Sequence, residues 1–231
     1  LEILMLKKLI ILFKLGRKVA KSDILKIVSK FQEPPFFIKI FFKILSFSLS
    51  PKKNLKINKD EGERLSDSLE SMGTTFIKLG QFLATRPDII GEELSKKLEN
   101  LQDKLPPFSL IQAKEIIKKD LGEDIFNSII NLSEPVAAAS IAQVHKAQIN
   151  DNGTIKDVAI KILRPNIKKI FNEEIDAMML FAFLIESFVK KSKRLKLVEV
   201  VFLLKEITNL EMDLRFEAAA ANEYADNTKN D

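Results

Sequence analysis

Strand-forming sequence is confined to one stretch of this chain, from Val136 to Leu163, and helical patterns dominate the rest. Within that stretch apolar and β-branched residues alternate or run together, and Asp151-Asn152-Gly153 interrupts them. Asn-Gly is a strong signal for a tight turn between antiparallel strands. The sequence therefore predicts two antiparallel strands that form one hairpin between two helical blocks, and an α+β fold class.

Capping and stop residues mark the ends of the predicted helices. Asn58 to Glu61 and Ser109 to Gln112 both have the spacing of a capping box, while Gly73 and Gly122 offer helix stops. The predicted helices span residues 58–72, 76–84, 92–101, 109–121, 166–190 and 197–224.

Composition excludes several classes of site. With 231 residues, 46% of them apolar, the chain is long enough to bury a core. It has no cysteine and one histidine, His145, so disulfide frameworks, zinc clusters and Cys-His nucleophile pairs are excluded or nearly so. We interpret His145 as a structural residue on a strand. The absence of cysteine fits a reducing, intracellular setting.

Positive charge is concentrated at the N-terminus. Residues 1–59 hold 14 Lys/Arg against 3 Asp/Glu, which leaves 23 against 29 for residues 60–231. The same region has two apolar stretches, Leu9–Phe13 and Phe36–Leu49, and Lys39 and Lys43 interrupt the second. Neither stretch approaches the roughly 18 to 20 apolar residues of a membrane span.

Two readings of the second stretch stay open. Interleaved lysines suit an amphipathic helix on an anionic membrane surface, with Phe36, Phe37, Phe41 and Phe42 buried in it. A helix that packs its phenylalanines on the protein and solvates its lysines fits equally well. A nucleic-acid surface is less well supported, because the lysines are dispersed, and we expect no nucleic-acid partner.

A possible phosphate-binding lysine ends the predicted hairpin. Val158-Ala159-Ile160-Lys161 matches the kinase strand whose lysine contacts nucleotide phosphates, and strand alternation places Ala159 and Lys161 on one face. An exposed lysine at the end of an edge strand would give the same pattern. The hairpin begins with Ala137-Ala138-Ala139-Ser140, where a protein kinase has its glycine-rich loop, and no G-x-G occurs in the chain.

Two further motifs make a family resemblance specific. Lys78-Leu79-Gly80-Gln81 precedes the hairpin and Glu211-Met212-Asp213 follows it. With the alanine run, these motifs occur in the order found in the UbiB family of atypical protein-kinase-like proteins, which the chain resembles over roughly residues 60 to 226. Thr74 is a departure, because a proline is expected there in relatives, and it puts the start of that helix in question.

The resemblance assigns roles to a nucleotide site. Lys161 would be the phosphate lysine, and Glu217, on the last helix, its ion-pair partner. Added β-carbons in the alanine loop would restrict the backbone and alter the pose of the nucleotide. The nucleotide-site residues implied are Ala137, Ala138, Ala139, Ser140, Ala159, Lys161 and Glu217.

A second group of residues would be regulatory. Lys78, Gly80 and Gln81 resemble the family's K-x-G-Q motif, carried on a helix that covers the protein-substrate site, and Glu211 would pair with Lys78. Glu211 and Asp213 resemble the E-x-D motif. From the residues alone, Lys78 and Gln81 also fit an ordinary helix surface, and two carboxylates two positions apart on a helix point in different directions. They would serve different neighbours rather than one metal ion.

The resemblance implies a protein-kinase-like N-lobe, a small antiparallel sheet plus an αC-type helix, with a mostly helical N-terminal extension. The expected divisions are a basic, Phe-rich segment (1–59), the K-x-G-Q extension (60–131) and a partial N-lobe (132–231). No catalytic or metal-binding motif of a kinase C-lobe occurs in the sequence. We therefore expect no catalytic residue within the chain, with Mg²⁺ ligands in an absent lobe, and interpret the chain as a partial member.

The implied function is that of an atypical kinase or ATPase that binds ATP and supports ubiquinone biosynthesis. The alternative is a non-catalytic scaffold or lipid-handling module of the quinone pathway that docks on an anionic membrane and on quinone-pathway proteins. A hydroxylase finds no support, because there is no dinucleotide glycine fingerprint and no iron-ligand cluster. We expect a cytoplasmic protein peripheral to a membrane.

Overall fold

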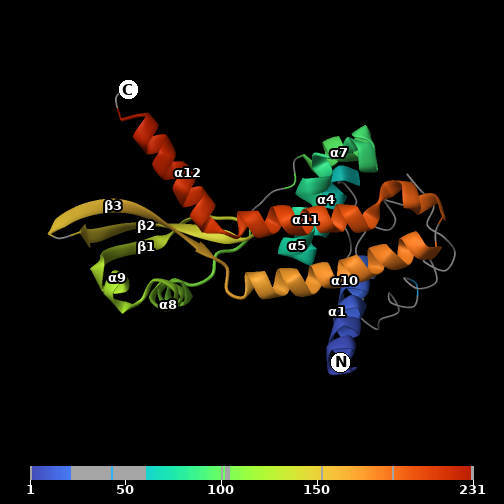
Figure 1. The fold of residues 1–231 in the computed structure, drawn as a ribbon, viewed down its shortest axis with the longest axis horizontal. Coiled ribbons are helices and arrows are strands. Elements are labelled where there is room, and N and C mark those ends of the chain that lie inside the picture. Colours follow the sequence, from blue (N-terminus) through green and yellow to red (C-terminus); the bar gives the residue numbers. More distant parts are fainter. Residues whose placement is uncertain are drawn as a thin grey trace. The chain divides into compact units, whose positions relative to one another are not determined.

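The computed structural model describes residues 2–21, 43, 61–99, 101, 105–151, 153–188 and 190–229. The chain forms two compact units, Leu1–Gln102 with Lys169–Ile207, and Asp103–Lys168 with Thr208–Asp231 (Figure 1). The predicted amphipathic stretch Phe36–Leu49 and the Asn58 cap lie outside the described residues, apart from Lys43. The α+β fold class is confirmed.

The described elements of the first unit are all helices. They comprise α1 (Glu2–Lys21), α4 (Glu61–Met72), α5 (Thr74–Ala84), α6 (Pro87–Ile90), α7 (Glu92–Leu98), residues 169–188 of α10 (Ile167–Phe188), the 3-10 helix η1 (Lys190–Leu195) and residues 197–207 of α11 (Leu197–Glu211). None of the helices within the described ranges is long and apolar enough to cross a membrane.

The predicted boundary between α4 and α5 is confirmed. Gly73 has φ +103°, a conformation that side chains with a β-carbon rarely adopt, so it ends α4 and caps α5. The helix α5 starts at Thr74 without the proline expected in relatives. Its apolar positions Phe76 and Ile77 are 5% and 0% exposed, so they anchor α5 in the core of the unit.

Gly80 lies in close contact with two leucine side chains. A β-carbon built on it would lie 2.5 Å from Leu101 Cδ2 and 2.8 Å from Leu69 Cδ1, both shorter than real contacts allow. Both leucines are buried, so neither can move freely. The glycine of the K-x-G-Q motif therefore has a structural reason, which the sequence alone did not reveal.

We predict that Gly80→Ala destabilises the chain by about 1 kcal/mol. Overpacking typically lowers the free energy of unfolding by about 1–3 kcal/mol, and the better helix propensity of alanine offsets about 1 kcal/mol of that loss. Urea unfolding followed by circular dichroism measures the change. In a Leu101→Ala background the same substitution should be nearly neutral. An equal loss in both backgrounds would contradict the steric explanation.

The second unit is built on a three-stranded antiparallel sheet, not the two strands predicted. Its strands are β1 (Ile129–Ala138), β2 (Ala142–Asp151) and β3 (Thr154–Leu163), in the order β1-β2-β3. The β2–β3 hairpin turns between Asp151 and Thr154 as predicted, where Gly153 has φ +89°. The strand β1 was not predicted, because Pro135 and the register shifts around it break the alternation of apolar residues. An edge strand tolerates such breaks.

Two helices cover one face of this sheet. They are α8 (Leu110–Leu121) and the short α9 (Glu123–Ser128), which the sequence did not predict. Ser109 caps α8 as expected, accepting a 3.3 Å hydrogen bond from the Gln112 backbone N–H. Ala113 and Ile117 of α8 form a buried cluster with Ile162 of β3. Figure 1 shows α8 and α9 on one side of the sheet and α12 on the other.

The predicted last helix is two helices. The helix α11 ends at Glu211, and α12 spans Leu214–Asn227. Asp213 interrupts them, because its carboxylate accepts a 3.2 Å hydrogen bond from the Arg215 backbone N–H and so caps α12. Glu211 and Glu217 therefore do not share a helix, which corrects the prediction.

We predict that Asp213 stays ionised to unusually low pH. The Arg215 side chain donates from Nε and Nη2 to the carboxylate and lowers the Asp213 pKa from 3.8 to about 2. Because the folded pKa is depressed, this pairing stabilises the folded chain above about pH 3.8 and is lost as pH falls toward 2. A titration of the Asp213 carboxyl carbon by NMR should show this, with Arg215→Gln moving the midpoint back up. A midpoint near 3.8 in both proteins would contradict it.

Candidate functional site

Lys161 lies on the open face of the sheet. It pairs with Val144 of β2, which pairs with Ala137 of β1, so the three side chains form one row across the sheet. Ala159, two positions earlier on β3, shares the face and is exposed. The opposite face carries Ile162, which is packed against α8. The predicted common face of Ala159 and Lys161 is confirmed.

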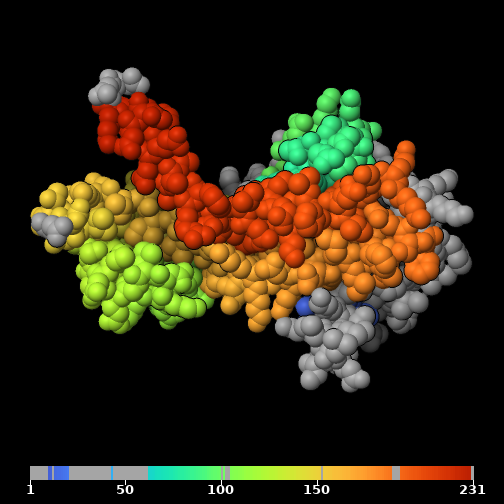
Figure 2. Space-filling model, viewed as in Figure 1, coloured from blue at the N-terminus to red at the C-terminus, as the bar shows by residue number. Residues whose placement is uncertain are grey.

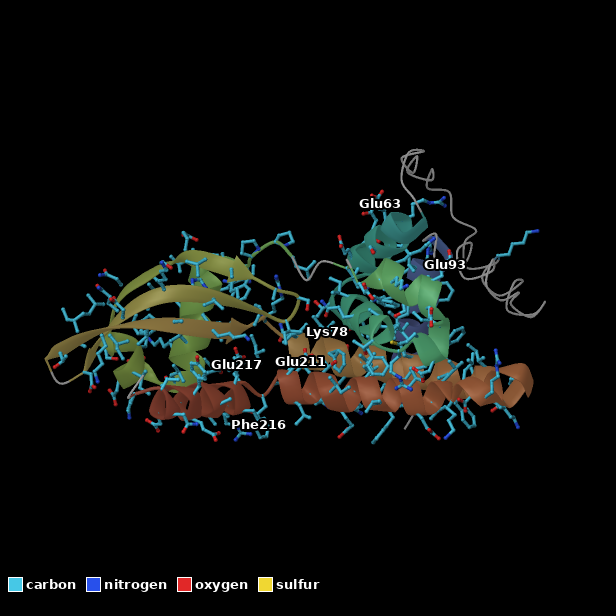
Figure 3. The ribbon with its side chains drawn as sticks, turned by 90° about the horizontal axis from the view of Figure 1, so that it is seen from above. Glu63, Lys78, Glu93, Glu211, Phe216 and Glu217 are labelled. Carbon is cyan, nitrogen blue, oxygen red and sulfur yellow. The ribbon has the colours of Figure 1, made fainter. Side chains whose placement is uncertain are left out.

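Glu217 meets Lys161 from the first turn of α12. The distance from Lys161 Nζ to Glu217 Oε2 is 2.6 Å, and the two side chains are 36% and 60% exposed. Figure 3 places Glu217 on the side of α12 toward the sheet and Phe216 on the outward side. A pair this exposed adds little stability. Its effect is to fix where the ammonium group lies.

Space remains between α12 and the sheet. No residue of α12 is buried, and the helix diverges from the sheet toward its C-terminal end (Figure 2). The exposed Ala137, Ala159 and Lys161 therefore face an open region within the second unit. A planar group could lie on this face beside the ammonium.

The alanine segment links β1 to β2 and does not start the β2–β3 hairpin as predicted. Ala137 and Ala138 end β1, while Ala139 and Ser140 belong to the connection, where the Ala139 N–H donates a 2.8 Å hydrogen bond to the Ala142 carbonyl. Among the described non-glycine residues only Asn166 and Lys196 have positive φ. The connection thus needs no glycine, and the alanines fit it without backbone strain.

Arg164, which no sequence motif had singled out, holds this connection in place. Its Nε and Nη2 donate to the Ala139 carbonyl at 3.0 and 2.7 Å, while Nη1 donates to Pro106 and Nη2 to Leu105 carbonyls at 2.9 and 3.1 Å. One guanidinium therefore ties the alanine segment to the chain before α8. The only sequence signal was an arginine directly after an apolar strand.

A buried polar network supports the same region. His145 Nδ1 lies 2.8 Å from the Ser133 carbonyl, and its Nε2 lies 2.9 Å from Gln143 Nε2. The Gln143 amide also bonds both the N–H and the carbonyl of Phe108, at 2.9 and 3.1 Å. Both ring nitrogens of His145 are engaged and the residue is 0% exposed. Its interpretation as a structural residue is confirmed.

The predicted regulatory residues fall in both units. Lys78 and Gln81 are half-buried on α5 and Gly80 is packed, as described above, whereas Glu211 ends α11 and Asp213 caps α12. Because Lys78 belongs to the first unit and Glu211 to the second, their pairing stays a prediction. Asp213 is held by Arg215, so it does have a neighbour of its own.

Metal-binding side chains are not gathered in the described part of the chain. Within those residues no group of three or more His, Cys, Asp or Glu side chains could hold a metal ion. The donor set around Lys161 is one ammonium and one carboxylate. The ammonium can donate a charge-assisted hydrogen bond to an anionic group such as a phosphate.

Comparison with known proteins gives the family. Residues 100–231 match the ABC1 atypical kinase-like domain. The chain is 39% identical over 199 residues to a protein of Marinobacter nauticus named "Probable protein kinase UbiB", and 36% identical over 195 and 179 residues to proteins of that name from Shewanella baltica and Vibrio cholerae. These alignments cover 86%, 84% and 77% of this chain. No solved structure matches it significantly.

The chain spans about a third of the length of these relatives, 35%, 35% and 32% respectively. The matched domain includes the whole sheet, the alanine segment, Lys161 and Glu217. The small sheet with helices around it is consistent with a kinase-like N-lobe. The resemblance drawn from the motifs is therefore confirmed, and the chain belongs to the ABC1 atypical kinase-like family of UbiB-type proteins.

Proposed function

We propose that this chain carries the ATP-binding lobe of an atypical kinase or ATPase that supports ubiquinone biosynthesis. The 2.6 Å pair between Lys161 Nζ and Glu217 Oε2 is the observation that carries the proposal. It joins a sheet lysine to a carboxylate on a separate helix, the arrangement that orients the phosphate lysine in kinases. The names of the relatives, probable protein kinases, agree with this function.

The open face of the sheet would hold the nucleotide. Ala137 and Ala159 are small and exposed, which leaves room for a flat base. Lys161 would contact the phosphates and Glu217 would keep its ammonium from turning away. The alanines of residues 137–139 would keep phosphates farther from the backbone than glycines do, because each adds a β-carbon. ATP itself would supply the transferable phosphoryl group.

Within the described residues no group of three or more His, Cys, Asp or Glu side chains could hold an ion such as Mg²⁺. We propose, as the sequence suggested, that its ligands lie outside the lobe. The chain of 231 residues should then bind nucleotide without turnover.

We predict that Lys161→Met weakens binding of a fluorescent ATP analogue by at least tenfold. A charge-assisted hydrogen bond to phosphate contributes about 1.5–3 kcal/mol, equivalent to about 10- to 150-fold in affinity. Lys156→Met is the matched control, because Lys156 lies on the same strand and pairs with Asp151 at 2.6 Å. Equal losses in the two variants, or no binding by the parent chain, would refute the proposed site.

We predict that Arg164→Lys weakens nucleotide binding about three- to tenfold while the chain still folds. Lysine keeps the charge but cannot span the three carbonyls that Arg164 contacts, so the alanine segment loses its fixed position. Titration with the same ATP analogue and thermal unfolding measure the two effects. Unchanged affinity together with a lowered Tm would show that Arg164 serves only the fold.

A non-catalytic scaffold or lipid-handling module on an anionic membrane surface stays the second proposal. Its basic, Phe-rich segment lies largely outside the described residues. Quinone-pathway proteins and the membrane surface are likewise proposed partners. The Lys161–Glu217 pair favours the nucleotide-binding function.

A further inference from the structure

The helices α10 and α11 expose an apolar surface in the first unit. They lie side by side (Figure 2), and two contacts join them. The Val198 backbone N–H donates a 3.1 Å hydrogen bond to Glu186, and Lys205 Nζ lies 3.8 Å from Asp176 Oδ1. Six large apolar side chains of the pair are 37–71% exposed, and we call them the outer patch: Phe183, Leu184, Phe188, Phe202, Leu203 and Ile207.

The outer patch is one surface rather than scattered residues. Ala182 of α10 and Val201 of α11 are buried, and both line the interior of the unit together with residues of α1 and α4 to α7, such as Leu69. Because both helices turn their inner sides toward the same neighbours, their outer sides lie together. A helix that is apolar on its inner and outer sides is normally covered on both. Contiguous apolar surface of this kind marks an interaction site.

The charges along α11 oppose the dipole of the helix. Three exposed basic residues, Lys193, Arg194 and Lys196, precede its first residue, and its last turn has no basic residue. A helix dipole favours acidic groups at the N-terminal end and basic groups at the C-terminal end. Glu199 lies in the first turn, but it pairs with Lys196 at 3.0 Å. The exposed Glu206 has no ionic partner within the described residues. Both ends of α11 therefore suit a partner of opposite charge.

A second copy of α11, placed antiparallel to the first, supplies the opposite charge at both ends. With a two-fold axis level with position 201, Lys196 of each chain faces Glu206 of the other, because the two positions are equally distant from the axis. Phe202 lies beside the axis and meets its own copy, as aromatic residues do at the centre of interfaces. An anionic membrane fits this surface less well, because Glu199 and Glu206 would face its head groups.

We infer that two copies of this chain associate through the outer patch, with their α11 helices antiparallel about a two-fold axis and two ion pairs between Lys196 and Glu206. The inference does not rest on the proposed nucleotide site, because Lys161 and Glu217 belong to the other unit.

The size of the outer patch sets the expected affinity. A phenylalanine side chain buries about 150–250 Å² in a core or interface, and the three of the patch are 59%, 71% and 55% exposed. They would bury roughly 350 Å² per chain, close to half of the about 800 Å² per partner of a standard interface. We therefore expect a dimer with a dissociation constant in the micromolar range.

Sedimentation equilibrium of the intact chain over the micromolar concentration range tests the inference, and it should show a reversible monomer–dimer equilibrium. Phe202→Ser should leave the chain monomeric. Phe216→Ser is the matched control, because Phe216 is similarly exposed, 61% against 55%, but lies on α12 in the other unit. Neither substitution empties a buried position, and circular dichroism establishes that both variants fold. Equal self-association of the two variants would overturn the inference.

Charge reversal tests the antiparallel arrangement. Glu206→Lys alone and Lys196→Glu alone each bring two like-charged pairs together and should weaken self-association roughly tenfold. A mixture of the two variants should regain it, because both pairs of the mixed dimer are again of opposite charge. A mixture that associates no better than its components would overturn the inference. A parent chain that stays monomeric but sediments with vesicles of anionic phospholipid would also overturn it and would identify a membrane as the occupant.

Discussion

The two-residue period of β3 decides what the second unit can do. Ile162 must be buried, because Ala113 and Ile117 of α8 close on it. Alternation then leaves Lys161 and Ala159 on the opposite face, which no described helix covers in the same way. A slip of one residue would bury the ammonium and expose the core. The hydrophobic contact with α8 therefore fixes the position of the charged group that carries the proposed function.

Hydrogen bonds from polar side chains position the rest of the site. Arg164 follows β3 directly and reaches the Ala139 carbonyl, so the strand that carries Lys161 also positions the alanine segment. Gln143 and His145 on β2 tie the segment before α8 and the middle of β1 to the same sheet. The same contacts therefore position the alanine segment, Lys161 and the buried face of the sheet together. Glu217 is the one site residue supplied by a separate helix.

Much of the fold could be predicted from local signals. Gly73, the Ser109 cap and the Gly153 turn each act through neighbours a few residues away, and each was placed correctly. The missed features depend on distant partners or on conflicting signals. Pro135 hid β1, and Asp213 broke a helix inside a periodic apolar pattern.

The site residues likewise divide into those that a local pattern predicted and those that depend on distant partners. The shared face of Ala159 and Lys161 followed from alternation, whereas Glu217 was assigned only by resemblance to the family. Arg164 donates hydrogen bonds to backbone carbonyls 25 to 59 positions away in the sequence, and a local sequence pattern cannot predict such distant partners.

A crystal structure of the chain with a non-hydrolysable ATP analogue tests the central claim most directly. The account predicts the base on the face formed by Ala137 and Ala159, with Lys161 Nζ within about 3.2 Å of a phosphate oxygen and Glu217 still beside it. A nucleotide bound elsewhere, or a Lys161 that faces solvent while Glu217 points away, would contradict it.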